Sequence, residues 1–265
     1  MPTLSFATLA CSLLIGTVAG AEPDDGSLRL RSSAESGDLR AMRELAASLL
    51  NEAEVQGDEA VYWLEEASAL GDAESMHRLA SLRFAGASAE QDKSAAVALW
   101  QAASVMGHTD AMYDLAVCYR DGHGTRQSAI RASLWFKNAA KAGRPEAMTA
   151  WGQCLFDGTG CMRDESAAVE WWTKAANRGE IDAMVSLAVA SGTGRGMPRN
   201  ETTSARWWRK AASHGCEIAM LVTAANYEMG MGVQVDHAEA ESWYARLRNG
   251  VDVTPPSAGL VLVLP

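Results

Sequence analysis

The sequence predicts an all-α protein, a solenoid of about six antiparallel helix-turn-helix repeats. Three observations carry this prediction. Aromatic residues recur every 36 residues, alanines recur at fixed offsets from them, and a glycine closes most of the units. Self-similarity at a fixed period of this length is the sequence signature of repeat architectures. Eight of the nine tryptophans fall into two columns of the repeat, which chance does not produce.

The second helix of each repeat, helix B, is predicted from the aromatic columns. The first column comprises Trp63, Leu99, Trp135, Trp171, Trp207 and Trp243. The next position comprises Leu64, Trp100, Phe136, Trp172, Trp208 and Tyr244. Alanine predominates three positions before the first column and four positions after it. Because these offsets lie on one face of a helix with 3.6 residues per turn, we expect a buried stripe of rings and alanines.

The ends of helix B are predicted from two further columns. Seven residues before the first aromatic column stand Asp92, Ser128, Asp164, Asn200 and Asp236. Their short polar side chains accept hydrogen bonds from the free amides of a helix start, so we expect N-caps. Eight residues after the aromatic column stand Gly71, Gly107, Gly143, Gly179 and Gly215, as expected for residues in the left-handed conformation at a helix end.

The first helix of each repeat, helix A, follows the closing glycine. One of its columns comprises Met42, Met76, Met112, Met148, Met184 and Met220. Three residues further on stand Leu45, Leu79, Leu115, Trp151, Leu187 and Thr223. Bends of the form Gly-x-Gly, beginning at Gly122, Gly158, Gly194 and Gly230, join helix A to helix B in the last four repeats. The first two repeats lack the double glycine.

These columns resemble the Sel-one-like repeat (SLR), a relative of the tetratricopeptide. The motif runs Asp110-Ala111-Met112-Tyr113-Asp114-Leu115-Ala116, then Tyr119, Gly122-x-Gly124 and Trp135-Phe136-Lys137-x-Ala139-Ala140. The resemblance covers roughly Ala34 to Arg248 and implies a right-handed superhelix of helix pairs, so we expect the solenoid to occupy residues 34–250. It also implies a non-enzymatic protein–protein interaction scaffold or adaptor, here one of the cell envelope or secretory pathway, that binds a protein or peptide on its concave face.

The two ends of the chain differ from the repeats. Residues 1–21 carry no charged side chain and end in Ala19-Gly20-Ala21, which predicts a signal peptide cleaved after Ala21. We therefore expect export to the periplasm or secretion, with anchoring by an uncleaved signal as the alternative. Residues 22–33 are expected to form a linker or a cap. Residues 251–265 are expected to form a tail, because Pro255-Pro256 stops the last helix.

Composition and motifs favour a binding protein over an enzyme. The chain has 33 acidic and 23 basic residues, a net charge of −10, and no run of lysine or arginine, so no nucleic-acid partner is expected. It contains no H-x-x-x-H, no G-x-S-x-G, no P-loop and no S-x-x-K. We expect no catalytic, cofactor or metal site, no stable membrane span after signal cleavage, and a monomer. Two alternatives stay open, an envelope enzyme of the β-lactam-binding or peptidoglycan-processing type and a secreted effector that engages a host protein.

The candidate binding residues come from two columns of helix A that vary between repeats. Tyr113, Val117, Val185, Val189 and Leu221 share one stripe of the helix and are apolar. We expect them to form the floor of a semi-apolar groove for a peptide. The alternative is that these side chains complete the core of the superhelix.

A disulfide is predicted between Cys154 and Cys161, where it would clamp the bend between helices A and B. The rival pair Cys118 and Cys154 occupies one column of adjacent repeats. Packed helices lie about 9–10 Å apart, which is too far for a disulfide. Cys118 and Cys216 are expected to be free thiols.

Overall fold

The computed structural model describes residues 25–51, 57–86 and 90–248, and every regular element in these ranges is an α-helix. The predicted signal peptide, residues 1–21, and the predicted tail, residues 251–265, lie outside the described residues. The first described helix, α2 (Asp25–Glu35), occupies most of the segment expected to be a linker or a cap. The all-α fold class is therefore confirmed.

The chain divides into two units, residues 1–70 and residues 71–265. The first unit holds α2, α3 (Leu39–Asn51) and α4 (Gly57–Ala69). Here α3 packs against both of the other helices and buries Met42, Leu45 and Leu49. An ion pair of 2.7 Å between Arg31 Nη2 and Glu59 Oε1 joins α2 to α4.

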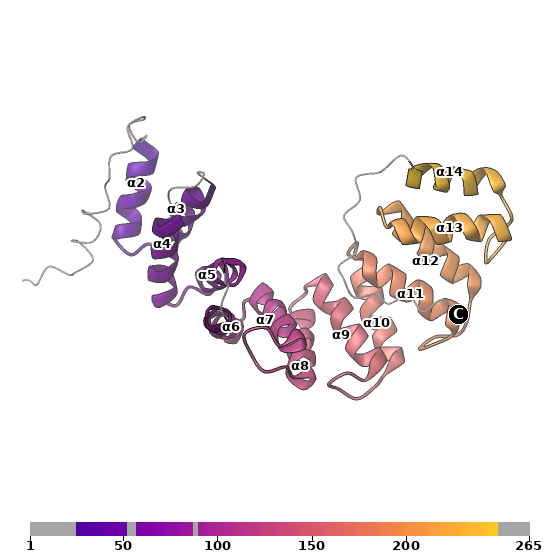
Figure 1. Ribbon diagram of the computed structural model, residues 1–265, viewed down its shortest axis with the longest axis horizontal. Helices are drawn as coiled ribbons and strands as arrows, with labels where there is room; N and C mark the ends of the chain where they lie inside the picture. The colour runs from indigo at the N-terminus through magenta and orange to yellow at the C-terminus, as the bar shows by residue number, and fades with distance from the viewer. Residues whose placement is uncertain (1–24, 52–56, 87–89, 249–265) are drawn as a thin grey trace, which may run out of the picture. The chain divides into compact units, whose positions relative to one another are not determined.

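In the second unit, the described residues 71–86 and 90–248 form five helix pairs, which Figure 1 labels α5 to α14. Its A helices are α5 (Ala73–Gly86), α7 (Thr109–Asp121), α9 (Pro145–Asp157), α11 (Ile181–Thr193) and α13 (Glu217–Met229). Its B helices are α6 (Glu90–Val105), α8 (Ala129–Lys141), α10 (Glu165–Ala176), α12 (Glu201–Ser213) and α14 (His237–Arg248). Each helix packs against the next one along the chain. Among the helices described, none combines the length and the apolar character needed to cross a lipid bilayer.

The predicted stripe of helix B forms the core. Alanines of the column four residues after the first aromatic are fully buried, as Ala103, Ala139 and Ala175 show. The second aromatic column is buried from Leu64 to Trp208 and becomes half-buried only at Tyr244. A small residue beside a large ring lets adjacent helix backbones approach while the ring fills the remaining space, which gives interiors their high packing density.

The predicted caps and bends are largely confirmed. Ser128, Asp164, Asn200 and Asp236 each accept a hydrogen bond from a backbone amide in the first turn of their helix B. The exception is Asp92, because α6 already begins at Glu90 and places Asp92 inside the helix. The first glycine of each Gly-x-Gly bend is the left-handed C-cap of α7, α9, α11 or α13.

The second glycine of each bend has a steric role that its φ angle alone does not explain. A Cβ on Gly160 would lie 2.0 Å from the carbonyl oxygen of Ala129, which stands in the first turn of α8 in the preceding repeat. The Ser133 hydroxyl on α8 donates a hydrogen bond to the Gly160 carbonyl at 2.9 Å, which holds the bend close to the start of α8. The bend therefore packs directly on the backbone of its neighbour.

We predict that Gly160→Ala destabilises the second unit far more than Gly179→Ala does. Both glycines have positive φ, +72° and +93°, but a Cβ on Gly179 would meet nothing within 4 Å. Gly179→Ala should cost about 1–2 kcal/mol through its backbone conformation alone. Gly160→Ala should add about 1–3 kcal/mol of overpacking. Urea midpoints of the two variants measure the difference, and equal midpoints would contradict the steric role.

Candidate functional site

The structure distributes the five predicted groove residues over different environments. Leu221 on α13 is 54% exposed and Val189 on α11 is 37% exposed. Tyr113 and Val117 on α7 are partly buried and pack against the core cluster. The Tyr113 ring also carries the Arg144 guanidinium at 4.2 Å from its centroid. Val189 and Leu221 thus remain accessible to a partner, whereas Tyr113 and Val117 are accessible only in part.

Val185 is a correction to the sequence-based groove, because its side chain is only 3% exposed. Every residue from Ala183 to Ala188 of α11 is buried. The reason is that α11 packs against both α10 and α12, so more than one stripe of this helix faces other helices. A visible signal was the absence of charged residues from Ala183 to Gly194. Val185 is therefore a core residue, as the alternative interpretation of these columns proposed.

Two exposed apolar residues on helix B were missed by the sequence reading. Ile130 and Leu134 stand one turn apart on α8 and are 71% and 54% exposed. In the following repeats their columns hold Ser166 and Glu170, then Thr202 and Arg206. The sequence therefore held a signal for this pair, because two apolar residues stand in columns that are otherwise mostly polar. Contiguous exposed apolar patches mark interaction sites.

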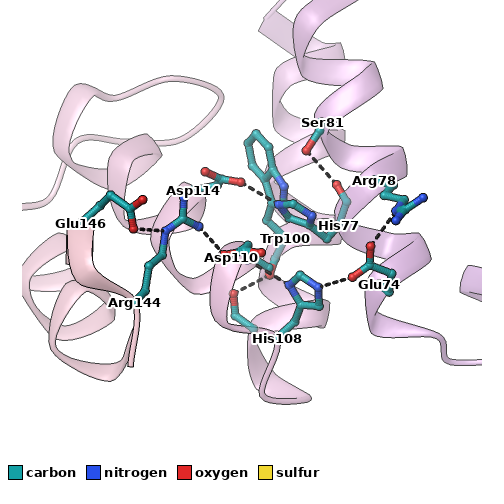
Figure 2. Close-up of polar contacts among 12 residues, drawn as sticks. Glu74, His77, Arg78, Ser81, Trp100, His108, Asp110, Asp114, Arg144 and Glu146 are labelled. Carbon is teal, nitrogen blue, oxygen red and sulfur yellow. Dashed lines mark hydrogen bonds and ion pairs between the residues drawn. The ribbon is translucent and has the colours of Figure 1, made fainter. Parts of the chain in front are cut away.

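A polar cluster joins the starts of three A helices, α5, α7 and α9 (Figure 2). It comprises Glu74, His77, Arg78, His108, Asp110, Asp114, Arg144 and Glu146. The His77 and His108 rings stack with centroids 4.7 Å apart. His77 Nε2 lies 2.8 Å from Asp114 Oδ2, and His108 Nε2 lies 2.9 Å from Glu74 Oε2. Both histidines are therefore bound to carboxylates across adjacent repeats.

The second contact of His108 fixes its hydrogen-bonding roles. Its Nδ1 accepts a hydrogen bond from the Ala111 amide at 3.2 Å and caps α7. Nδ1 must be unprotonated to accept, so Nε2–H donates to Glu74. The hydrogen bond from His108, with help from Arg78, lowers the Glu74 pKa to about 2. Glu74 is therefore ionised at neutral pH and is a binding and positioning group rather than a proton donor.

The cluster follows one spacing rule, in which the residue after the closing glycine meets the residue 34 positions before it, at Gly107 and again at Gly143. His108 meets Glu74, and Arg144 Nη1 meets Asp110 Oδ1 at 2.6 Å. At the next repeat the rule brings two acids together, Glu180 and Glu146. Burial, followed by the charges of Glu146 and Asp182, raises the Glu180 pKa to about 7. The first two contacts are favourable and the third is not.

The four described cysteines are free thiols in this structure. Cys161 Sγ donates to the Cys154 carbonyl oxygen at 3.3 Å, so the two members of the predicted pair lie side by side. Burial raises the pKa of both Cys118 and Cys154 to about 12, which keeps these thiols protonated and unreactive at neutral pH. The Cys154–Cys161 disulfide is not formed here and stays a prediction.

The chemistry that this arrangement supports is recognition. Within residues 28–51, 58–86 and 93–248, no group of three or more His, Cys, Asp or Glu side chains is arranged to hold a metal ion. The polar cluster offers carboxylates, two imidazoles and two guanidinium groups that are already paired with one another. Exposed apolar residues, among them those on α8, α11 and α13, are available for contact with a partner.

We predict that Glu180→Gln stabilises the protein at pH 8 and leaves it unchanged at pH 4. The unfolded carboxyl ionises near pH 4.5, but the folded one ionises only near 7, so its charge disfavours folding above that range. After discounting for solvent at this half-buried group, the gain is about 1 kcal/mol, or about 2–4 °C in Tm. Glu170→Gln, at an exposed acid of α10, serves as the control. A gain of equal size at both pH values would contradict the assignment.

The repeats are recognised by a family model of the Sel1 repeat. It matches residues 39–72, 73–108, 109–143, 145–180, 181–216 and 218–247. These boundaries follow the helix pairs from α3 to α14. No sequence among curated proteins matches the chain.

Solved structures show the same fold. A protective antigen of uropathogenic Escherichia coli strains, which displays an SLR fold, is 30% identical with a TM-score of 0.80 over 84% of this chain and 48% of that chain. This chain thus spans about half the length of that relative. A Sel1 repeat protein from Oxalobacter formigenes is 20% identical with a TM-score of 0.69, over 85% of this chain and 97% of that one. An immunity protein from Pseudomonas aeruginosa is 21% identical with a TM-score of 0.50, over 86% of this chain and 88% of that one.

The family match spans most of the chain, and its segments coincide with helix pairs whose buried columns and caps are those of the repeat described above. The all-α repeat architecture is shared with the solved SLR structures. The chain belongs to the Sel1 repeat family.

Proposed function

We propose that this protein is a non-enzymatic scaffold that binds a protein or peptide through the face of its A helices. Sel1 repeats commonly serve as protein–protein interaction scaffolds, and solenoids of this kind present extended concave surfaces to their partners. The observation that carries the proposal is the accessibility of Val189 and Leu221, which lie on two consecutive A helices, α11 and α13. Apolar side chains that a fold leaves exposed on consecutive repeats are suited to contact a partner.

The exposed pair Ile130 and Leu134 supports a second contact area on helix B of another repeat. Its residues lie on α8, whereas the predicted groove residues lie on A helices. The two areas can therefore be changed independently, which allows one to serve as a control for the other.

We predict that Val189→Ser combined with Leu221→Ser abolishes partner capture without changing Tm. Surface substitutions away from packed features change stability by only about 0.5 kcal/mol. The measurement is quantitative mass spectrometry of proteins that co-purify with the tagged full chain from its native cells, beside a melting curve. Ile130→Ser with Leu134→Ser is the matched control, because it removes the same kind of exposed surface from helix B.

Val185→Ser completes the comparison, since it places a hydroxyl in a buried position of α11. It should lower the free energy of unfolding by about 1–3 kcal/mol. If the Ile130 and Leu134 variant loses partner capture while the Val189 and Leu221 variant keeps it, the partner binds α8 and the proposed face is wrong. A large fall in Tm for the Val189 and Leu221 variant would mean that these residues belong to the core.

We further propose that the scaffold acts after export, in the cell envelope or outside the cell. The support is the uncharged segment of residues 1–21 with its small-x-small ending at Ala21. The expected result is a mature chain that begins at or near Glu22, measured as the intact mass of protein recovered from its native source. A soluble cytosolic form that retains residues 1–21 would contradict it.

A further inference from the structure

A cavity of about 160 Å³ lies between α12 and α13, partly open to solvent. The α12 side contributes Thr202, Arg206 and Arg209, and the α13 side contributes Thr223, Asn226 and Tyr227. All of these residues belong to the second unit, and none of them is among the predicted groove residues. The cavity therefore requires its own explanation.

The cavity is associated with a departure from the repeat at Thr223. Its column in the preceding repeats holds Leu115, Trp151 and Leu187, and all three are buried. Thr223 is equally buried, at 2% exposed, but its side chain is smaller than any of these. A large-to-small change in a packed core leaves a void when the surroundings do not collapse. Here the void is bordered by polar residues rather than closed by apolar ones.

The polar groups around the cavity have unused hydrogen-bonding capacity. The Thr223 hydroxyl is buried and has no hydrogen-bond partner. Among the described residues, neither the amide of the buried Asn226 nor the guanidinium of the solvent-exposed Arg206 has a side-chain hydrogen bond or ion pair with another residue. A buried polar group without a partner is destabilising, so native proteins rarely keep one without a reason.

The charge at the cavity is positive, against a chain of net charge −10. Arg209 Nη1 donates to the Tyr227 hydroxyl at 3.1 Å, which is a neutral partner. By contrast, Arg144, Arg163 and Arg195 each pair with a carboxylate. Arg206 and Arg209 stand one turn apart on α12, and a guanidinium binds a carboxylate through two parallel hydrogen bonds.

The volume limits the size of the ligand. Cavities that bind drug-sized molecules or cofactors measure about 300–1,000 Å³, whereas about 150 Å³ suffices for a benzene molecule. The cavity therefore fits a group the size of one amino-acid side chain. Two guanidinium groups and unpartnered hydroxyl and amide groups favour a negatively charged group over an apolar one.

We propose that this cavity binds the carboxylate side chain of a glutamate or aspartate from a partner peptide, with Arg206 and Arg209 as its charged donors. Asn226 and Thr223 then supply neutral hydrogen bonds at the inner wall. The inference rests on the proposed function only in that the ligand is a peptide. It concerns a site separate from Val189 and Leu221.

The test is a titration of the full chain with the capped tripeptide Ala-Glu-Ala, its Ala-Gln-Ala counterpart and inorganic phosphate. Binding is followed through the Nε–Hε NMR signals of Arg206 and Arg209. A charged hydrogen bond lost on going from glutamate to glutamine should weaken binding about tenfold or more. Equal affinity for the two peptides, or tighter binding of phosphate than of the glutamate peptide, would overturn the proposal.

Two variants test the site from both sides. Thr223→Leu restores the side chain of the neighbouring repeats, so it should fill the cavity, abolish glutamate binding and leave Tm equal or higher. Arg206→Gln combined with Arg209→Gln should weaken binding about tenfold or more while the cavity remains. Arg126→Gln, at an exposed arginine in the bend between α7 and α8, controls for the loss of a positive charge away from the cavity. Glutamate binding that survives in Thr223→Leu contradicts the site.

Failure of this proposal is distinguishable from failure of the proposed function. Val189→Ser with Leu221→Ser should bind the glutamate peptide as the unmodified chain does, because neither residue lines the cavity. Thr223→Leu that keeps full partner capture but loses the peptide would confirm the cavity as an independent site. Loss of peptide binding in the Val189 and Leu221 variant would place the ligand outside the cavity.

Discussion

The close approach of a bend glycine to the preceding repeat is the constraint on which the stacking of the second unit depends. Gly124, Gly160, Gly196 and Gly232 each face the backbone of the residue 31 positions earlier, where a Cβ would lie at 2.0–2.5 Å. No other residue fits at this distance. The contact sets how far the start of one helix B stands from the next bend. The aromatic and alanine columns then fill the space that this spacing leaves.

The polar contacts between repeats follow the spacing that the bends impose. In three successive repeats, the residue after the closing glycine meets the residue 34 positions earlier. Evolution can place opposite charges there, as in Arg144 and Asp110, or like charges, as in Glu180 and Glu146. Each contact joins nearest neighbours only, so an unfavourable pair at one interface is tolerated when adjacent interfaces are well packed.

Most of the fold and little of the site could be predicted from the sequence, and the reason is physical. Columns such as the alanines around Trp172 face the same neighbour in every repeat, so their burial repeats with the sequence. The exposure of Val185 depends on helices on both sides of α11, which a single column does not reveal. Asp92 lies inside α6 because that helix begins two residues earlier than the cap column indicates. The Thr223 column was visible in the sequence, but the cavity also required Arg206 and Asn226, which come from two different helices.

Departures from the repeat are therefore the places where function is to be sought. A residue that satisfies its column maintains the stack, and replacing it affects stability before it affects binding. Leu221, Thr223 and Asn226 all lie on α13, and each differs in character from most of the residues in its column. Thr223 and Asn226 line the cavity, and the Thr223 hydroxyl has no hydrogen-bond partner. Leu221 exposes an apolar side chain. None of these features stabilises the stack, and each is suited to contact with a ligand, which is why both of the proposed binding sites include residues of α13.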